Sequence, residues 1–274
     1  MLFSVATASL YFCPFEQTLE IIAEADFKNI ELDLFWEKND YAMAQHLRNV
    51  PIKKAVNLIK RSGLKISSIH DGGGLLENNY STEGFINPSI DKYLNELGYA
   101  PECLVFHTPH IKGRNNPDLW KKISDRIVCS IEKYRKVCSY VTIENNTSFK
   151  GYYVPLTSPE ELNEFATQNE LGITFDTTHY ADIGIDIIEA AKLTRENIKT
   201  IHLSDFVKGR KHVFIGEGEL DLKGFFEIVD KNNLSIITLE CSLSSINNPD
   251  QFMNFNEMVS RLKEGKTKLM NFLK

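Results

Sequence analysis

Six apolar segments of this chain each end in a histidine, an aspartate or a glutamate. They are Ser68-Ile69-His70, Val105-Phe106-His107, Thr142-Ile143-Glu144, Thr174-Phe175-Asp176, Thr200-Ile201-His202 and Thr238-Leu239-Glu240. Apolar β-forming residues that run straight into an ionisable group indicate that the end of each segment faces a ligand. Imidazole nitrogens and carboxylate oxygens bind divalent metal ions. The pattern therefore predicts that these ends meet around one metal site.

Four of these residues form the ligand set that we expect to hold the metal: Glu144, Asp176, His202 and Glu240. Three carboxylates in one pocket would repel one another strongly, and a divalent cation is the simplest way to remove that repulsion. Oxygen and nitrogen ligands without sulfur suit Mn²⁺, Zn²⁺, Co²⁺ or Fe²⁺ better than Ca²⁺. We expect the cofactor to be Mn²⁺ or Zn²⁺.

The other histidines could extend this site. His70 and His107 could form a second metal site with Glu144 as the bridge, and His179 and His212 could form a third or bind substrate oxygens. A single histidine at a strand end is more often a structural, hydrogen-bonded residue than a ligand. The prediction depends on clustering, because all but one of the seven histidines lie at these strand ends or in the loops that follow them.

Periodicity and turn residues predict the elements that must position these side chains. Strands are predicted over residues 2–6, 29–34, 64–70, 103–107, 140–144, 173–176, 198–203 and 234–240. Helices are predicted over 15–25, 51–61, 88–99, 117–138, 183–193 and 222–231, from Ser158 onward, and over 250–273 as one helix or two with a break at Gly265. Eight βα units in 274 residues predict a single α/β domain over residues 1–274, a (β/α)8 TIM barrel, with an open doubly wound sheet as the alternative. Both folds gather the carboxyl ends of their strands, so the predicted site does not depend on the choice.

The composition narrows the class of protein. The chain is 42% hydrophobic and 25% charged, an ordinary globular balance, and its net charge is −6. This acidic excess argues against a protein that coats nucleic acid, although it leaves room for local basic patches. The five cysteines contain no CxxC pair and are predicted to be reduced packing residues. Because the sequence has neither a signal peptide nor an apolar run near the ~20 residues that span a bilayer, we expect a cytoplasmic protein without membrane contact.

Three motifs resemble a known family. They are Phe175-Asp176-Thr177-Thr178-His179, Ile201-His202-Leu203-Ser204-Asp205, and His212 with Gly216-Glu217-Gly218. In order and spacing they are similar to motifs of the xylose isomerase-like TIM-barrel superfamily, which contains sugar isomerases and epimerases and the endonuclease IV enzymes of DNA repair. For the sugar branch, the resemblance implies one cation held by the four residues Glu144, Asp176, His202 and Glu240.

The resemblance to the sugar branch also implies roles for individual residues. Glu144 and Glu240 would remove and return a proton α to the carbonyl of a metal-chelated ketose. His179 matches a substrate-binding imidazole, Lys208 lies near a position where this branch often has an arginine, and His212 is a third expected substrate-binding residue. The expected function is a metal-dependent isomerase or epimerase of a sugar, sugar phosphate or polyol. Its partner would be a small carbohydrate, and it could form a homo-oligomer.

The endonuclease branch gives the alternative, a zinc-dependent AP endonuclease or phosphodiesterase. Eight of its nine zinc ligands match this sequence: His70, His107, Glu144, Asp176, His179, His202, His212 and Glu240. The ninth, an aspartate, falls on Arg210, whose cationic side chain cannot replace a carboxylate ligand. The stretch after the third strand, Asp71-Gly72-Gly73-Gly74, lacks the aromatic residue that enters DNA in that branch, so nucleic acid is the less favoured partner. A barrel that only binds a ligand or a protein is a further alternative.

Overall fold

The computed structural model describes residues 1–34, 47, 49–72, 75–76, 86–113, 117–243 and 253–274. Eight strands close into a barrel, and every neighbouring pair in it is parallel. In order around the barrel they are β1 (Leu2–Ala6), β2 (Asn29–Leu34), β3 (Lys65–Asp71), β5 (Cys103–Phe106), β7 (Tyr140–Glu144), β9 (Gly172–Asp176), β10 (Ile198–Leu203) and β13 (Ile236–Leu239). Because β1 pairs with both β2 and β13, the predicted TIM barrel is confirmed and the open sheet is excluded.

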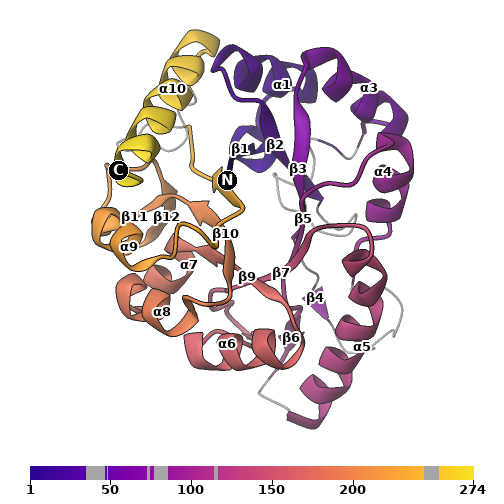
Figure 1. Ribbon diagram of the computed structural model, residues 1–274, viewed down its shortest axis with the longest axis vertical. Coiled ribbons are helices and arrows are strands. Elements are labelled where there is room, and N and C mark those ends of the chain that lie inside the picture. Colours follow the sequence, from indigo (N-terminus) through magenta and orange to yellow (C-terminus); the bar gives the residue numbers. More distant parts are fainter. Residues whose placement is uncertain (35–46, 48, 73–74, 77–85, 114–116, 244–252) are drawn as a thin grey trace.

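Helices surround the strands, as Figure 1 shows. They are α1 (Phe15–Glu24), α3 (Ile52–Ser62), α4 (Ser89–Leu97), α5 (Pro117–Arg135), α6 (Pro159–Gln168), α7 (Thr177–Asp182), α8 (Ile187–Thr194), α9 (Leu222–Ile228) and α10 (Phe255–Phe272), with a 3-10 turn η1 (Thr7–Leu10) after β1. Ser158 caps α6 as predicted, because its side chain accepts from the Glu161 N–H. None of the helices in the described part of the chain has the length and apolar character needed to cross a bilayer.

Two small sheets lie outside the barrel, within connections that follow barrel strands. One contains β4 (Leu75–Leu76), β6 (His110–Lys112) and β8 (Tyr152–Tyr153), and the other is the hairpin of β11 (Asp205–Val207) and β12 (Arg210–Val213). Their strands lie outside the predicted strands and helices, and Gly73 and Gly74, in the stretch after the third predicted strand, lie outside the described residues.

The structure decides the helix predictions for residues 183–193 and 250–273. In place of one helix over 183–193, α7 begins directly after Asp176 and is separated from α8 by Gly184, whose φ of +79° ends the first helix. Of the two alternatives predicted over 250–273, the structure shows one helix, because α10 runs through Gly265 without a break; residues 250–252 of that prediction lie outside the described part. A Cβ at Gly265 would lie 3.1 Å from Leu239 Cδ1 and 3.3 Å from Phe214 Cζ, so glycine lets α10 pack closely on the barrel.

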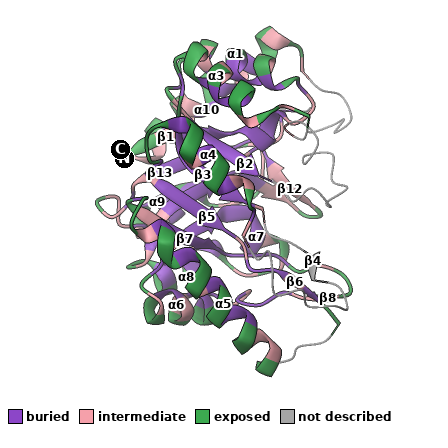
Figure 2. Cartoon of the chain, turned by 90° about the vertical axis from the view of Figure 1, so that its right-hand side faces the viewer, coloured by how far each residue is buried: buried purple, intermediate pink, exposed green. Residues whose placement is uncertain are grey.

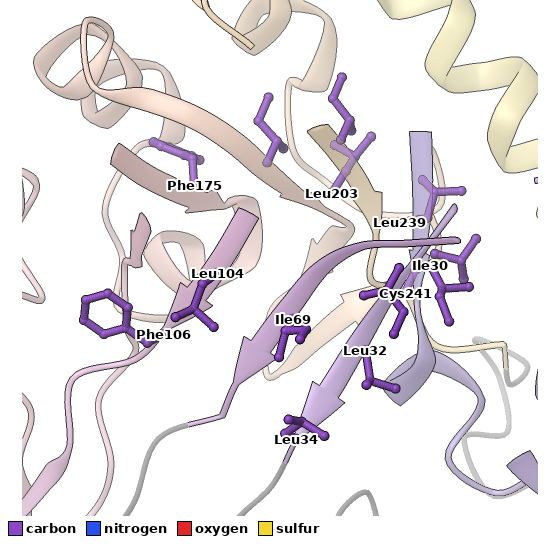
Figure 3. Packing of buried hydrophobic residues seen from close by; sticks show 14 of the residues in the cluster. Ile30, Leu32, Leu34, Ile69, Leu104, Phe106, Phe175, Leu203, Leu239 and Cys241 are labelled. Atoms are coloured by element: carbon purple, nitrogen blue, oxygen red, sulfur yellow. The ribbon is translucent and has the colours of Figure 1, made fainter. Parts of the chain in front are cut away.

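Side-chain alternation along the strands separates an outer apolar face from an inner polar one. Ile30, Leu32 and Leu34 of β2 join the main hydrophobic cluster between strands and helices (Figure 3). Burial of each such side chain stabilises the fold by ~1.5–3 kcal/mol. The residues between them, Glu31 and Asp33, occupy the opposite face and are also buried. Figure 2 shows the consequence for the whole barrel, in which buried strands lie inside helices with exposed outer faces.

Hydroxyl side chains line the inside of the barrel, two residues before the end of β1 and two residues before each of the four predicted ligands. We call the side chains of Ser4, Thr142, Thr174, Thr200 and Thr238 the hydroxyl layer; each is at most 1% exposed. Thr174 Oγ1 lies 2.6 Å from Thr142 Oγ1 and 2.6 Å from Thr200 Oγ1, and Ser4 Oγ lies 2.7 Å from Thr238 Oγ1. These contacts connect neighbouring strands below the residues that end β7, β9 and β10.

Thr174→Val should lower the free energy of unfolding by about 1–3 kcal/mol, because two buried hydroxyls lose a partner while the shape of the side chain is kept. Urea unfolding measures the change. Val137→Thr is the matched control, since Val137 is 46% exposed and the swap there should change stability little. An equal loss of stability in both variants would contradict the role of the hydroxyl layer.

Candidate metal centre

The four predicted ligands converge at the carboxyl end of the barrel. Glu144, Asp176, His202 and Glu240 each offer one ligand atom, and these atoms all lie within 4.8 Å of one another; we call this group the metal centre. His202 Nδ1 is 3.2 Å from Glu144 Oε2 and 2.8 Å from Glu240 Oε2. Three of the side chains are fully buried, whereas that of Glu240 is 17% exposed. Parallel strands of a closed barrel end on one face, and this brings together residues that are far apart in sequence.

Each residue of the metal centre has a buried polar atom without an aligned hydrogen-bond partner among the described residues: Glu144 Oε1, Asp176 Oδ2, His202 Nδ1 and Glu240 Oε2. The short distances from His202 Nδ1 to Glu144 and Glu240 are therefore close contacts without the geometry of an N–H···O bond. Buried polar atoms are almost always paired, so a convergent unpaired set needs a partner. A divalent cation ligated by oxygen and nitrogen fits these atoms.

The two oxygens of Asp176 have different partners. Oδ1 caps α7 by accepting from the backbone N–H groups of Thr178 at 2.6 Å and His179 at 2.8 Å, which leaves Oδ2 for the metal centre. Asn145 fixes the backbone of the same residue, since its Nδ2 donates to the Asp176 carbonyl and its Oδ1 accepts from the Asp176 N–H. One carboxylate thus begins a helix and faces the metal centre.

Asp176→Asn should abolish stoichiometric binding of Zn²⁺ or Mn²⁺ while the protein stays folded. Asparagine caps a helix as well as aspartate does, so the substitution keeps the acceptor for α7 and removes the anionic oxygen. Elemental analysis and thermal unfolding with and without a chelator measure both effects. Asp186→Asn is the control, because Asp186 caps α8 with the same geometry away from the metal centre. Full metal content in Asp176→Asn would exclude the aspartate as a ligand.

His70 and His107 form the predicted second group with Glu144. Their Nε2 atoms lie 3.2 Å and 2.8 Å from Glu144 Oε2, and their rings stack with centroids 4.9 Å apart. Burial opposes ionisation of Glu144, but the charges of His107, His202 and His70 outweigh it and hold the pKa of that carboxyl well below its usual range. Burial also opposes protonation of His70, yet the Glu144 charge and the Asp33 hydrogen bond raise its pKa well above the usual value.

His179 and His212 form a third group with Asp176. His179 lies on α7 and not in a loop, and its Nδ1 is 2.9 Å from the Asn145 carbonyl. His212 Nδ1 is 3.2 Å from the Glu240 carbonyl. A carbonyl only accepts, so Nδ1 is the donor in each ring and Nε2 is the atom left for another contact. Burial lowers the pKa of His179 against the opposing effect of Asp176 and Glu144, so this imidazole is a neutral acceptor.

Asp205 fixes the β11–β12 hairpin, on which His212 lies. Its Oδ2 accepts from Gly216 N at 2.9 Å and its Oδ1 from Leu220 N at 3.1 Å, which ties the hairpin to the segment that follows it. Lys208, a predicted substrate-binding residue, is exposed in the hairpin turn. Arg210, at the position of the missing endonuclease ligand, is half-buried on β12.

Gly218→Ala should destabilise the protein and displace His212. A Cβ there would collide with Asp205 Oδ1 and lie 2.6 Å from the Phe206 carbonyl oxygen, and a backbone atom cannot move away cheaply. Unfolding experiments and the NMR signals of His212 check this. Gly98→Ala is the control, because a Cβ at Gly98 meets open space and its cost comes only from the φ of +76°. A smaller loss of stability at Gly218 than at Gly98 would argue against the close contact.

Two acids of β2, Glu31 and Asp33, lie at the site although they were not among the predicted site residues. Glu31 Oε1 lies 2.9 Å from His202 Nε2, and Asp33 Oδ1 lies 3.1 Å from His70 Nδ1. The signal was present in Ile30-Glu31-Leu32-Asp33-Leu34, where acids alternate with apolar residues. Such alternation puts both acids on the face opposite the apolar cluster.

Comparison with known proteins agrees with this geometry. The family described as xylose isomerase-like TIM barrel matches residues 19–254. The inosose dehydratase of Mesomycoplasma hyopneumoniae is 24% identical over 254 residues, which cover 80% of this chain and 78% of that protein. Among solved structures, the IolI protein with a bound zinc atom has a TM-score of 0.74 at 15% identity, with 100% of this chain and 99% of that chain covered. D-psicose 3-epimerase in the presence of D-fructose has a TM-score of 0.69 at 11% identity, with 100% and 99% covered. Because the family match includes every strand end of the metal centre, the chain belongs to the xylose isomerase-like TIM-barrel family.

Proposed function

We propose that this protein is a divalent-metal-dependent isomerase or epimerase of a sugar or related polyol, in which Glu144 and Glu240 transfer a proton. The observation that carries the proposal is the metal centre, whose buried, unpaired oxygen and nitrogen atoms converge at the mouth of the barrel. Similar proteins named for an inosose and for D-psicose support the same substrate class, since both compounds are polyhydroxylated ketones.

A divalent cation at the metal centre would polarise adjacent oxygens of the substrate and so acidify the C–H beside its carbonyl. Glu144 on β7 and Glu240 after β13 approach from strands that β9 and β10 separate in the barrel. Two carboxylates on different sides of one carbon can remove a proton from one face and return it to the other. The rings of His179 and His212, whose Nδ1 atoms face backbone carbonyls and leave Nε2 for other contacts, suit substrate hydroxyl groups.

The proposal is tested by proton exchange, which reports the first step whatever the product. The metal-loaded protein is incubated in D₂O with a panel of ketoses, their phosphates and inososes, and NMR follows deuterium at the carbon next to the carbonyl. We expect incorporation with at least one member, and the product then distinguishes an epimer or isomer from a dehydrated ketone. No exchange with any member, in protein that contains the metal, would contradict the proposal.

Glu240→Gln and Glu144→Gln should each lower turnover of that substrate by ~10²-fold or more, because a glutamine side chain cannot transfer the proton. Steady-state kinetics and the rate of deuterium exchange measure the loss. Glu219→Gln is the control, since Glu219 is exposed and does not belong to the metal centre. Unchanged exchange in Glu240→Gln would remove Glu240 from the reaction.

The second group, His70 and His107 with Glu144, favours one other function, the metal-dependent cleavage of phosphodiesters. Two cations about 3.5–4 Å apart can stabilise both oxygens of a phosphoryl displacement. Two or three metal ions per chain, together with chelator-sensitive incision of a duplex that contains an abasic site, would establish this function in place of the first.

A further inference from the structure

Glu31 lies inside the barrel on β2, a strand that contributes nothing to the metal centre. Its side chain is 1% exposed, and its Oε2 accepts from Ser68 Oγ at 2.7 Å. Its Oε1 faces two imidazoles, at 2.9 Å from His202 Nε2 and 3.7 Å from His70 Nδ1. A buried carboxylate is costly unless it is paired, so one of these rings must be its partner.

The geometry identifies His202 as that partner. His70 Nδ1 already has a hydrogen bond with Asp33 Oδ1 at 3.1 Å. Glu31 Oε1 and His202 Nε2 each lack a hydrogen-bond partner among the described residues, and at 2.9 Å from each other they are the pair that a small rotation of either side chain would align. The other nitrogen of His202, Nδ1, faces Glu144 and Glu240 in the metal centre. The His202 ring therefore lies between a carboxylate on one side and the metal centre on the other.

A neutral imidazole carries one proton, and the position of that proton decides which nitrogen can bind a cation. We propose that Glu31 is a positioning residue that accepts the Nε2 proton of His202 and thereby leaves the Nδ1 lone pair directed at the metal centre. Carboxylates behind metal-bound histidines act in this way, and their loss typically weakens metal binding 10–100-fold. The inference rests on metal binding by the proposed function, and it adds a residue beyond the four ligands of the metal centre.

The same contact has a purely structural explanation, in which Glu31 only fills polar space beside the hydroxyl layer. That explanation predicts loss of stability on substitution but no change in the His202 tautomer. It also predicts that a change elsewhere in the hydroxyl layer affects metal affinity as much. Ser4 provides this comparison, because it is buried, contacts Thr238 Oγ1 at 2.7 Å and lies on β1, which supplies no ligand to the metal centre.

The experiment titrates Zn²⁺ into the metal-free forms of the wild type, Glu31→Leu, Glu31→Gln and Ser4→Ala, with calorimetry as the readout. We expect Glu31→Leu to raise the Kd by 10–100-fold, and Glu31→Gln to raise it less, because the amide oxygen still accepts the proton. Ser4→Ala should bind as the wild type does. Glu31→Gln preserves size and polarity, so it tests the inference even if Glu31→Leu does not fold.

A second readout is ¹⁵N NMR of His202 in the zinc-loaded protein. We expect the proton on Nε2 in the wild type and a loss of that single tautomer in Glu31→Leu. Zinc affinity in both Glu31 variants equal to that of the wild type, or a wild-type ring that carries its proton on Nδ1, would overturn this inference and leave the proposed function standing. A wild type that binds no zinc or manganese would overturn both, so the two failures can be told apart.

Discussion

The charge concentrated at the mouth of the barrel is the constraint on which the rest of the site depends. Five carboxylates, those of Glu31, Asp33, Glu144, Asp176 and Glu240, lie there with little contact with water. Without a metal ion, imidazolium groups balance them: burial opposes the charge of His202, but the nearby carboxylates, Glu144 foremost, raise its pKa well above the usual range. Metal binding needs neutral imidazoles and so releases these protons. The protonated histidines therefore offset part of this negative charge when no metal is bound, and after losing a proton they can serve as ligands or donors.

Much of the site could be predicted because two regular features of the fold coincide, the alternation of side chains along each strand and the parallel closure of the barrel. Alternation along a strand puts Thr142 and Glu144, or Thr200 and His202, on one face, and parallel closure brings those faces together. The same reasoning did not find Glu31, because it lies within β2, a strand with no predicted ligand at its end. The importance of Glu31 depends on the register that puts it opposite Ser68 on β3. Register follows from closure of the whole barrel, which no local pattern encodes. Likewise α7 begins where Asp176 supplies a cap, although its six residues are too few to show helical periodicity.

The connections at the mouth show why the site could be predicted better than its specificity. The aromatic segment after β7 packs on β6: the Phe149 ring lies 5.1 Å from that of His110 and 5.2 Å from that of Tyr152. Burial, and then the charge of His107, lower the pKa of His110 to about 4, so this ring is neutral near pH 7. These contacts favour a role of the aromatic segment in packing at the rim over a role in contacting a sugar substrate. The shape of the rim depends on packing between residues far apart in sequence, which no local pattern reveals. The positions of the ligands follow from where the strands end, and strand ends can be recognised in the sequence.

The number of metal ions and the role of Glu144 are linked through one oxygen atom. Glu144 Oε2 lies 2.8 Å from His107 Nε2, 3.2 Å from His70 Nε2 and 3.2 Å from His202 Nδ1, so both candidate metal groups share it. If a cation occupied the metal centre alone, the Glu144 oxygen that did not bind it would keep its lone pairs for proton transfer. A second cation at His70 and His107 would make the carboxylate a bridge, and a bridging carboxylate is a poor base because its charge is shared between two ions. Asp33 accepts a hydrogen bond from His70 Nδ1, which leaves His70 Nε2 facing Glu144 for either a proton or a cation. In the proposed function, the balance between carbon-acid chemistry and phosphodiester chemistry would thus depend on whether a proton or a second cation lay between His70, His107 and Glu144.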